Sequence, residues 1–117
     1  MDYPLNELID RYTIHLLKSE RTSEPQTIAL NEYLSAINQC GSMDDVQTYI
    51  DKLYEINGQI WDAESEIRAG LENNYGLDEI GRRALLVRDL NKKRVAIKNE
   101  IVTRFNSGYL DVKVNYA

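Results

Sequence analysis

A mostly apolar seven-residue repeat occurs twice in this chain, in two stretches of similar length separated by a turn. The first stretch comprises Val46, Ile50, Leu53, Asn57, Ile60, Glu64, Ile67 and Leu71. The second comprises Ile80, Arg83, Val87, Leu90, Arg94, Ile97, Ile101 and, one residue late, Phe105. Steps of four and three place each set on one face of a helix, and two such faces pack side by side. With a turn at residues 73–76, the pattern predicts an antiparallel hairpin of helices over about 43–72 and 77–105.

Two shorter helices are expected before the hairpin. We expect the first over about residues 4–20, because the proline at its start suits a first helical turn. The second is expected to begin at Ser23, with Gln26 closing a capping box, and to end at Gly41 in a left-handed cap. The sequence thus predicts an all-α, four-helix-bundle-like fold in a single domain, residues 1–117.

The final segment, residues 109–117, departs from the helical period. Its apolar side chains alternate with polar ones, as in a β-strand: Leu110, Val112, Val114 and Tyr116. No other strand is expected to pair with it, so we expect an extended tail. Three interpretations stay open: the tail lies over the helices, it pairs with the same tail of a second molecule, or it is disordered.

The composition of the chain excludes several classes of protein. With 43% hydrophobic and 28% charged residues, it matches a folded protein rather than a disordered one. A net charge of -5 disfavours general nucleic-acid binding, which needs an excess of cations. No apolar run is long enough to cross a bilayer, and charges throughout residues 1–20 argue against a signal peptide. The single cysteine, Cys40, favours a cytoplasmic location.

The two long predicted helices carry opposite charge. Eight acids lie between Asp44 and Glu72 against two bases, and seven bases lie between Arg82 and Lys98 against one acid. We expect these charges to flank the apolar seam and to set the pairing and register of the helices. They do not predict a nucleic-acid site, because no aromatic residues interleave with the basic run.

Polar residues on or beside the predicted seam are the best candidates for a ligand site. The candidates are Asn57, Trp61, Glu64, Arg68, Asn91, Arg94 and Lys98, to which the first helix could add Asp10, Arg11 and Lys18. Buried ions are costly unless they are paired, so these groups must bind one another or a ligand. Two interpretations stay open. One is a closed network that specifies helix register; the other is an anion pocket in which Arg68, Arg94 and Lys98 hold a phosphate or carboxylate.

The sequence indicates no catalytic residue, no metal and no cofactor. His15 is the single histidine, so neither a zinc cluster nor a Glu-x-x-His pair can be assembled. Cys40 has no histidine near it in the sequence that would suggest a thiolate pair. Glycine is too sparse for a phosphate-binding loop. An enzyme is therefore the less favoured interpretation.

Residues 56–68 combine an Asn, a Trp, several acids and an Arg on one long helix, and residues 90–98 add an Asn, a basic run and a Lys. Together with residues 5–14 and 18–21, and with Lys113 and Tyr116, they resemble a family of short bacterial proteins known only as a domain of unknown function. The chain departs from the family pattern at Ser65, Lys92, Val112 and Val114. The resemblance implies a helical fold and no known activity.

A shorter likeness covers the first helix alone. Residues 8–11 and 16–21 are similar to the opening of helical chorismate mutases, which bind a dicarboxylate inside a bundle with Arg and Lys. Many amphipathic helices match such a short pattern, so it carries little weight beside the other observations.

Two function classes follow from these features. The favoured one is a non-enzymatic helical interaction or assembly protein that forms homo-oligomers, most simply dimers. The alternative is a small-anion binding protein or enzyme that uses the basic cluster between the long helices. Nucleic-acid and membrane partners are not expected. The contacts of Arg68 and Arg94 distinguish the classes, because a closed network saturates them with Glu64, Asp10 and Asn57, whereas a ligand site leaves them facing an open cleft.

Overall fold

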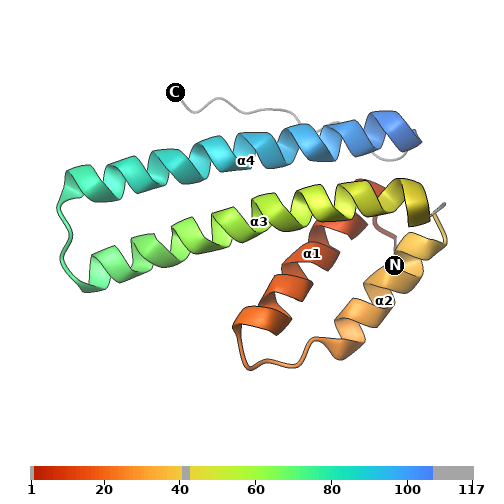
Figure 1. The fold of residues 1–117 in the computed structure, drawn as a ribbon, viewed down its shortest axis with the longest axis horizontal. Coiled ribbons are helices and arrows are strands. Elements are labelled where there is room, and N and C mark those ends of the chain that lie inside the picture. Colours follow the sequence, from red (N-terminus) through yellow and green to blue (C-terminus); the bar gives the residue numbers. More distant parts are fainter. Residues whose placement is uncertain (1, 41–42, 107–117) are drawn as a thin grey trace.

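The computed structural model describes residues 2–40 and 43–106, and these residues form four α-helices (Figure 1). The helices are α1 (Leu5–Arg21), α2 (Thr27–Asn38), α3 (Met43–Glu72) and α4 (Leu77–Phe105). The all-α fold and the bounds predicted for the two long helices are confirmed. The cap predicted at Gly41 and the extended tail predicted at residues 109–117 lie outside the described residues.

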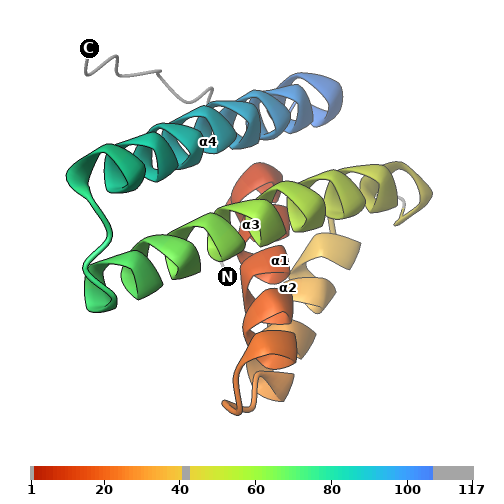
Figure 2. The ribbon, with the colours of Figure 1, turned by 60° about the vertical axis from the view of Figure 1, so that its left-hand side comes forward.

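Helices α3 and α4 form the predicted antiparallel hairpin (Figures 1 and 2). In the turn, Asn74 adopts a left-handed backbone with φ of 57°, a conformation that asparagine tolerates better than most residues. The amide of Tyr75 donates a hydrogen bond to the carbonyl of Gly70 at 2.8 Å. A Cβ at residue 70 would lie 2.7 Å from the Tyr75 ring, so this close approach requires glycine.

Helix α1 crosses the hairpin near its open end and contacts both α3 and α4, whereas α2 packs mainly against α1 (Figure 2). The core lies at this crossing. Its fully buried side chains come from all four helices and include Leu5, Leu8 and Ile9 of α1, Ile37 of α2, Val46 and Leu53 of α3, and Ile101 of α4. Burial of this apolar surface is the main force that holds α1 on the hairpin.

The N-cap residue of α2 is Gln26, three residues after Ser23, the position where the sequence predicts it. Ser23 lies outside the helix, and Gln26 is the N-cap residue but makes no side-chain cap hydrogen bond. The Gln26 Oε1 atom instead lies 2.7 Å from Nδ1 of His15, whose ring stacks on Tyr33 with centroids 5.2 Å apart. The capping-box prediction is therefore wrong, because the side chain that was expected to close the box bonds to α1.

The hairpin has two halves that differ in burial. In the proximal half, residues 43–63 and 90–105, side chains of both helices belong to the core beneath α1. In the projecting half, residues 64–89, only Gly70 is buried. This half extends beyond α1 and α2 (Figure 1) and leaves four leucines exposed: Leu71, Leu77, Leu85 and Leu86.

Candidate functional site

A buried carboxylate, that of Asp10, lies where α1 crosses the hairpin. Asn6, Asp10, Thr13 and Leu17 recur along α1 at steps of four, three and four, and all four are buried. This spacing forms one face of a helix, which α1 turns toward α3 and α4. Only 2% of Asp10 is exposed. A charged group this deeply buried must be compensated by hydrogen bonds or by opposite charge.

Arg94 of α4 supplies the opposite charge. Its Nε atom donates to Asp10 Oδ1 at 2.9 Å, and its Nη2 atom donates to Asp10 Oδ2 at 2.5 Å. This two-point contact matches the planar fork of the guanidinium to the carboxylate, a geometry that lysine cannot reproduce. Arg94 therefore fixes the position of α4 relative to α1.

Asn57 of α3 joins the same carboxylate. Its Nδ2 atom donates to Asp10 Oδ1 at 3.0 Å and to Thr13 Oγ1 at 2.9 Å. The Thr13 hydroxyl in turn donates to the backbone carbonyl of Asp10 at 2.8 Å. Asp10, Thr13, Asn57 and Arg94 thus form a polar cluster that links α1, α3 and α4. We call these four residues the Asp10 cluster.

A second contact between α1 and α4 lies one turn away. Lys98, which is 8% exposed, places Nζ 2.7 Å from Oε1 of Glu7. The other carboxylate oxygen of Glu7 lies 3.7 Å from Nε of Arg11, on the same helix. Each of the two cations that α4 turns toward α1 therefore faces a carboxylate of α1.

The pKa of Asp10 reflects two opposing effects. Burial by itself raises the pKa of the carboxyl, because it penalises the charged form. The hydrogen bonds and charge of Arg94, with further contributions from Asn57 and Lys98, outweigh burial and hold the pKa of Asp10 below its ordinary value of 3.8. At neutral pH the cluster contains an ionised carboxylate beside an ionised guanidinium.

Three of the seven candidate residues meet at this crossing and four do not. Asn57 and Arg94 both bond to Asp10, and Lys98 lies beside them on Glu7. Glu64 and Arg68 are exposed, and Arg68 donates to the hydroxyl of Ser65 at 3.1 Å. The two other candidates, Trp61 and Asn91, are partly exposed.

The position of α1 explains this division. Asn57, Trp61, Glu64 and Arg68 follow one stripe of α3. Helix α1 crosses that stripe at Asn57, and beyond the crossing Trp61 is partly exposed and Glu64 and Arg68 are exposed. The first-helix candidates divide in the same way. Asp10 enters the cluster, whereas Arg11 pairs with Glu7 and the Nζ atom of Lys18 lies 2.9 Å from Glu24.

Sequence reasoning missed Glu7 and Thr13. Thr13 lies three residues after Asp10, and Glu7 lies three residues before it, so both share its side of α1. The signal that could have found Thr13 is the run Asn6, Asp10, Thr13 and Leu17, which places three polar residues at helical spacing on a face that ends in leucine.

Ion pairs on the surface join α3 to α4, and one of them, between Glu66 and Arg83, combines the acidic and basic runs named in the sequence. Two of them combine an acid of α3 with a base of α4, and one reverses the signs. The pairs are Asp45 with Arg104 at 3.6 Å, Glu66 with Arg83 at 2.8 Å, and Lys52 with Glu100 at 3.4 Å.

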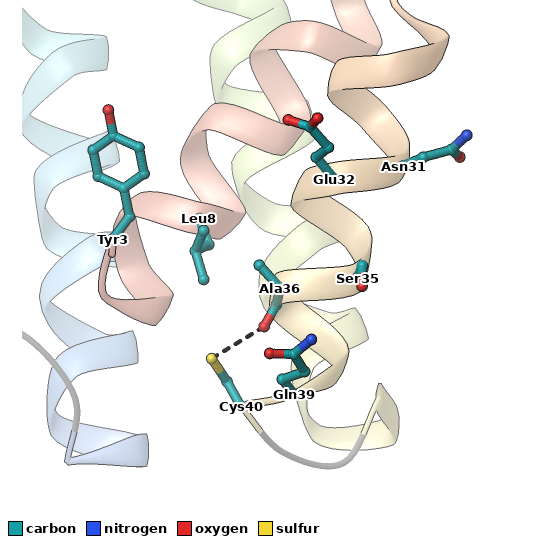
Figure 3. Close-up of a pocket in the computed structure, with 8 residues that line it drawn as sticks. All are labelled: Tyr3, Leu8, Asn31, Glu32, Ser35, Ala36, Gln39 and Cys40. Carbon is teal, nitrogen blue, oxygen red and sulfur yellow. Dashed lines mark hydrogen bonds between the residues drawn. The ribbon is translucent and has the colours of Figure 1, made fainter. Parts of the chain in front are cut away.

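A shallow hollow lies beside α2, away from the Asp10 cluster (Figure 3). Tyr3 and Leu8 form one side of it, and Glu32 and Cys40 lie on α2 or directly after it. The Cys40 thiol donates to the carbonyl of Ala36 at 3.3 Å. The residues that line this hollow include a carboxylate and no cation, so it does not suit an anion.

Comparison with known proteins finds no matching family model, no matching curated protein and no matching solved structure. The resemblance to the short bacterial family accordingly stays a prediction. Across residues 2–40 and 43–106, no group of three or more His, Cys, Asp or Glu side chains is placed to hold a metal ion. In the same part of the chain, no helix has both the length and the apolar character of a membrane span.

Proposed function

We propose that this protein is a non-enzymatic helical interaction or assembly module that forms homo-oligomers, with a dimer favoured. The observation that carries the proposal is the projecting half of the hairpin. Over 26 residues, from 64 to 89, it turns large apolar side chains toward water and buries only Gly70. A long helical arm without a core of its own is a typical means of contacting another helical surface.

All four exposed leucines among the described residues lie in the projecting half of the hairpin. Isolated apolar residues are common on protein surfaces and need no explanation. Here Leu71 and Leu77 flank the hairpin turn, with exposed fractions of 63% and 89%, and Leu85 and Leu86 follow on α4. The turn end of the hairpin is therefore the apolar region that a partner would cover.

The contacts of the Asp10 cluster and of Lys98 count against the anion-binding alternative. Arg94 and Lys98 are two of the three cations expected at an anion site, and each faces a carboxylate of α1, Asp10 or Glu7. An incoming phosphate or carboxylate would have to displace these partners. Arg68, the third cation of that hypothesis, lies on the exposed part of α3. The anion-binding alternative is therefore less well supported. A cytoplasmic location fits the single Cys40, which has no second cysteine in the chain.

The oligomeric state tests this proposal. We expect light scattering coupled to gel filtration to give twice the chain mass at micromolar concentration. Leu71→Ser should shift the protein toward the monomer, because it removes an exposed apolar contact without touching the core. Ile28→Ser is the matched control, since Ile28 is 77% exposed but lies on α2, and it should leave the mass unchanged.

Two results would contradict the proposal. A monomeric mass at every concentration would show that the chain does not self-assemble. Stabilisation of the protein by phosphates, nucleotides or dicarboxylates in a thermal-shift screen, lost in the Arg94→Met variant, would favour the anion-binding alternative. A tight site at 100 times its dissociation constant adds about 2.7 kcal/mol of stability, which such a screen detects.

A further inference from the structure

The stripe of α3 that α1 covers continues into the projecting half without a cover. Ile50, Leu53 and Asn57 are buried beneath α1 and α4. The same steps of four and three then lead to Trp61, Glu64, Arg68 and Leu71. Of these, Trp61 is partly exposed and the other three are exposed, Leu71 to 63%. The stripe therefore has the spacing of a helix contact along its whole length and a partner along only half of it.

Both charges of this uncovered stretch are four residues apart on α3 but form no close ion pair with any described residue. In the part of the chain that the structure describes, neither Glu64 nor Arg68 forms an ion pair, and Arg68 bonds to Ser65. This contrasts with the neighbouring Asp62 and Glu66, which pair with Arg21 and Arg83.

We propose that residues 61–71 pair with the same residues of a second copy of this chain, antiparallel and about a twofold axis. The inference rests on the proposed function and specifies its partner and register. In one antiparallel register Glu64 of each copy lies opposite Arg68 of the other. The same register places Trp61 opposite Leu71 of the second copy. This follows because residues 61 and 71 lie equally far on either side of the midpoint between residues 64 and 68.

The charge pattern selects this partner and this direction. A stripe with one acid and one base is complementary to itself only when two copies run antiparallel, since a parallel pair would place like charges opposite each other. A stripe suited to nucleic acid or to an acidic membrane surface would instead carry one sign of charge. The antiparallel contact also forms twice, as a twofold axis requires.

The fold limits how far the two copies can overlap. In this register Asn57 of one copy lies level with Tyr75 of the other, at the hairpin turn. Helix α1 already occupies the stripe at Asn57, so the turn of the second copy would meet α1 there. Contact is thereby confined to about ten residues of α3 on each copy, a length of about 15 Å at a helical rise of 1.5 Å.

Charge reversal tests the pairing. Glu64→Arg places two bases on the stripe and Arg68→Glu places two acids there, so each variant alone would oppose like charges at both contacts. We expect each to weaken the dimer by about tenfold, judged by sedimentation across a concentration series. An equimolar mixture of the two should form a mixed dimer at least as tight as the natural one, because both contacts then combine opposite signs. Glu55→Arg, at another exposed position of α3 outside the stripe, is the control and should leave the dimer unchanged.

The outcomes separate this inference from the proposed function. A natural chain that is monomeric at all concentrations overturns both. A stable dimer that tolerates each reversal, or that is not restored in the mixture, overturns the pairing but leaves the assembly function standing. Circular dichroism checks that each variant keeps its helices, which exposed substitutions should not disturb.

In a Cys40→Ser background, single cysteines at residues 64 and 68 provide a second measurement. A mixture of Glu64→Cys and Arg68→Cys chains should cross-link to each other on oxidation more readily than either does to itself. Preferential cross-linking of Glu64→Cys to itself would indicate a parallel contact and overturn the register.

Discussion

Two groups of charged residues in this protein each pair an arginine with carboxylates, but the carboxylate is buried in one group and exposed in the other. At the crossing of α1 with the hairpin, Arg94 holds Asp10, whose side chain is 3% exposed. On the projecting half, Arg83 bonds to Glu79 at 2.9 Å and to Glu66 at 2.8 Å, and its own side chain is 25% exposed. The Arg94 side chain is itself 29% exposed, so the two arginines differ little, but their carboxylate partners do: Glu79 and Glu66 are 38% and 60% exposed, against 3% for Asp10.

Burial of the carboxylate, rather than the number of hydrogen bonds, therefore decides how much such an ion pair contributes to the free energy of unfolding. Water can replace either partner of an exposed pair, so losing one costs little. Water cannot reach Asp10, so removing its partner leaves a buried charge without compensation. The pKa of Glu79 is also lowered, by hydrogen bonds from Arg82 and then Arg83, but that of Asp10 is lowered against the opposing effect of burial.

The largest effect is expected when the buried pair is broken. Arg94→Ala should destabilise the fold by about 3–5 kcal/mol, because it leaves the carboxylate of Asp10 buried without its cation. Urea denaturation followed by circular dichroism measures this loss. The double variant Asp10→Leu with Arg94→Met should recover most of it, since apolar side chains of similar branching and length then replace both ions. A double variant no more stable than Arg94→Ala would mean that packing, and not the orphaned charge, dominates.

A smaller loss is expected at the amide of the same cluster. Asn57→Ala removes the donor to Asp10 and Thr13, and should lower the free energy of unfolding by about 1–3 kcal/mol. The bonds from Arg94 remain, so the effect should be less than that of Arg94→Ala. An equal loss for the two variants would show that the cluster acts as one unit rather than as separable bonds.

Protonation of Asp10 should contribute to the dependence of the unfolding free energy on pH. Its pKa is lower in the folded state than in the unfolded chain, so the stabilisation is fully present above the unfolded value of about 3.9. It is lost as the pH falls through the lower, folded pKa. Unfolding free energies measured from pH 6 downward should therefore decline more steeply below about pH 4 in the natural chain than in the Asp10→Leu, Arg94→Met double variant. Parallel profiles for the two proteins would contradict this assignment.

The smallest effect is expected at the exposed group. Arg83→Gln removes the bonds to Glu79 and Glu66, yet should change the melting temperature little, and moderate salt should abolish the difference. Lys52→Gln, which loses another exposed pair between α3 and α4, serves as a comparison. A loss at Arg83 as large as that at Arg94 would remove the distinction between the two groups.

The division of the candidate site follows from the same geometry. The candidates were chosen because they share faces of α3 and α4, and that part of the prediction depends only on spacing. Which of them become buried depends on where α1 lies, and it lies over Asn57 and Arg94 and not over Arg68. Asn57 and Arg94 are joined through one oxygen, Oδ1 of Asp10, to which both donate.

The sequence by itself determined the helices, their order, the turn at residues 73–76 and the pairing of the two long helices. These features depend on local causes: the seven-residue period, the residues that tolerate a left-handed turn, and charges that neighbouring helices present to each other. The late start of α2 and the composition of the Asp10 cluster were decided by the tertiary structure. Gln26 bonds to His15, and Asp10 meets Arg94, across 11 and 84 residues of chain. Contacts of this kind depend on the angle and position at which whole helices cross, and no short-range pattern encodes that crossing.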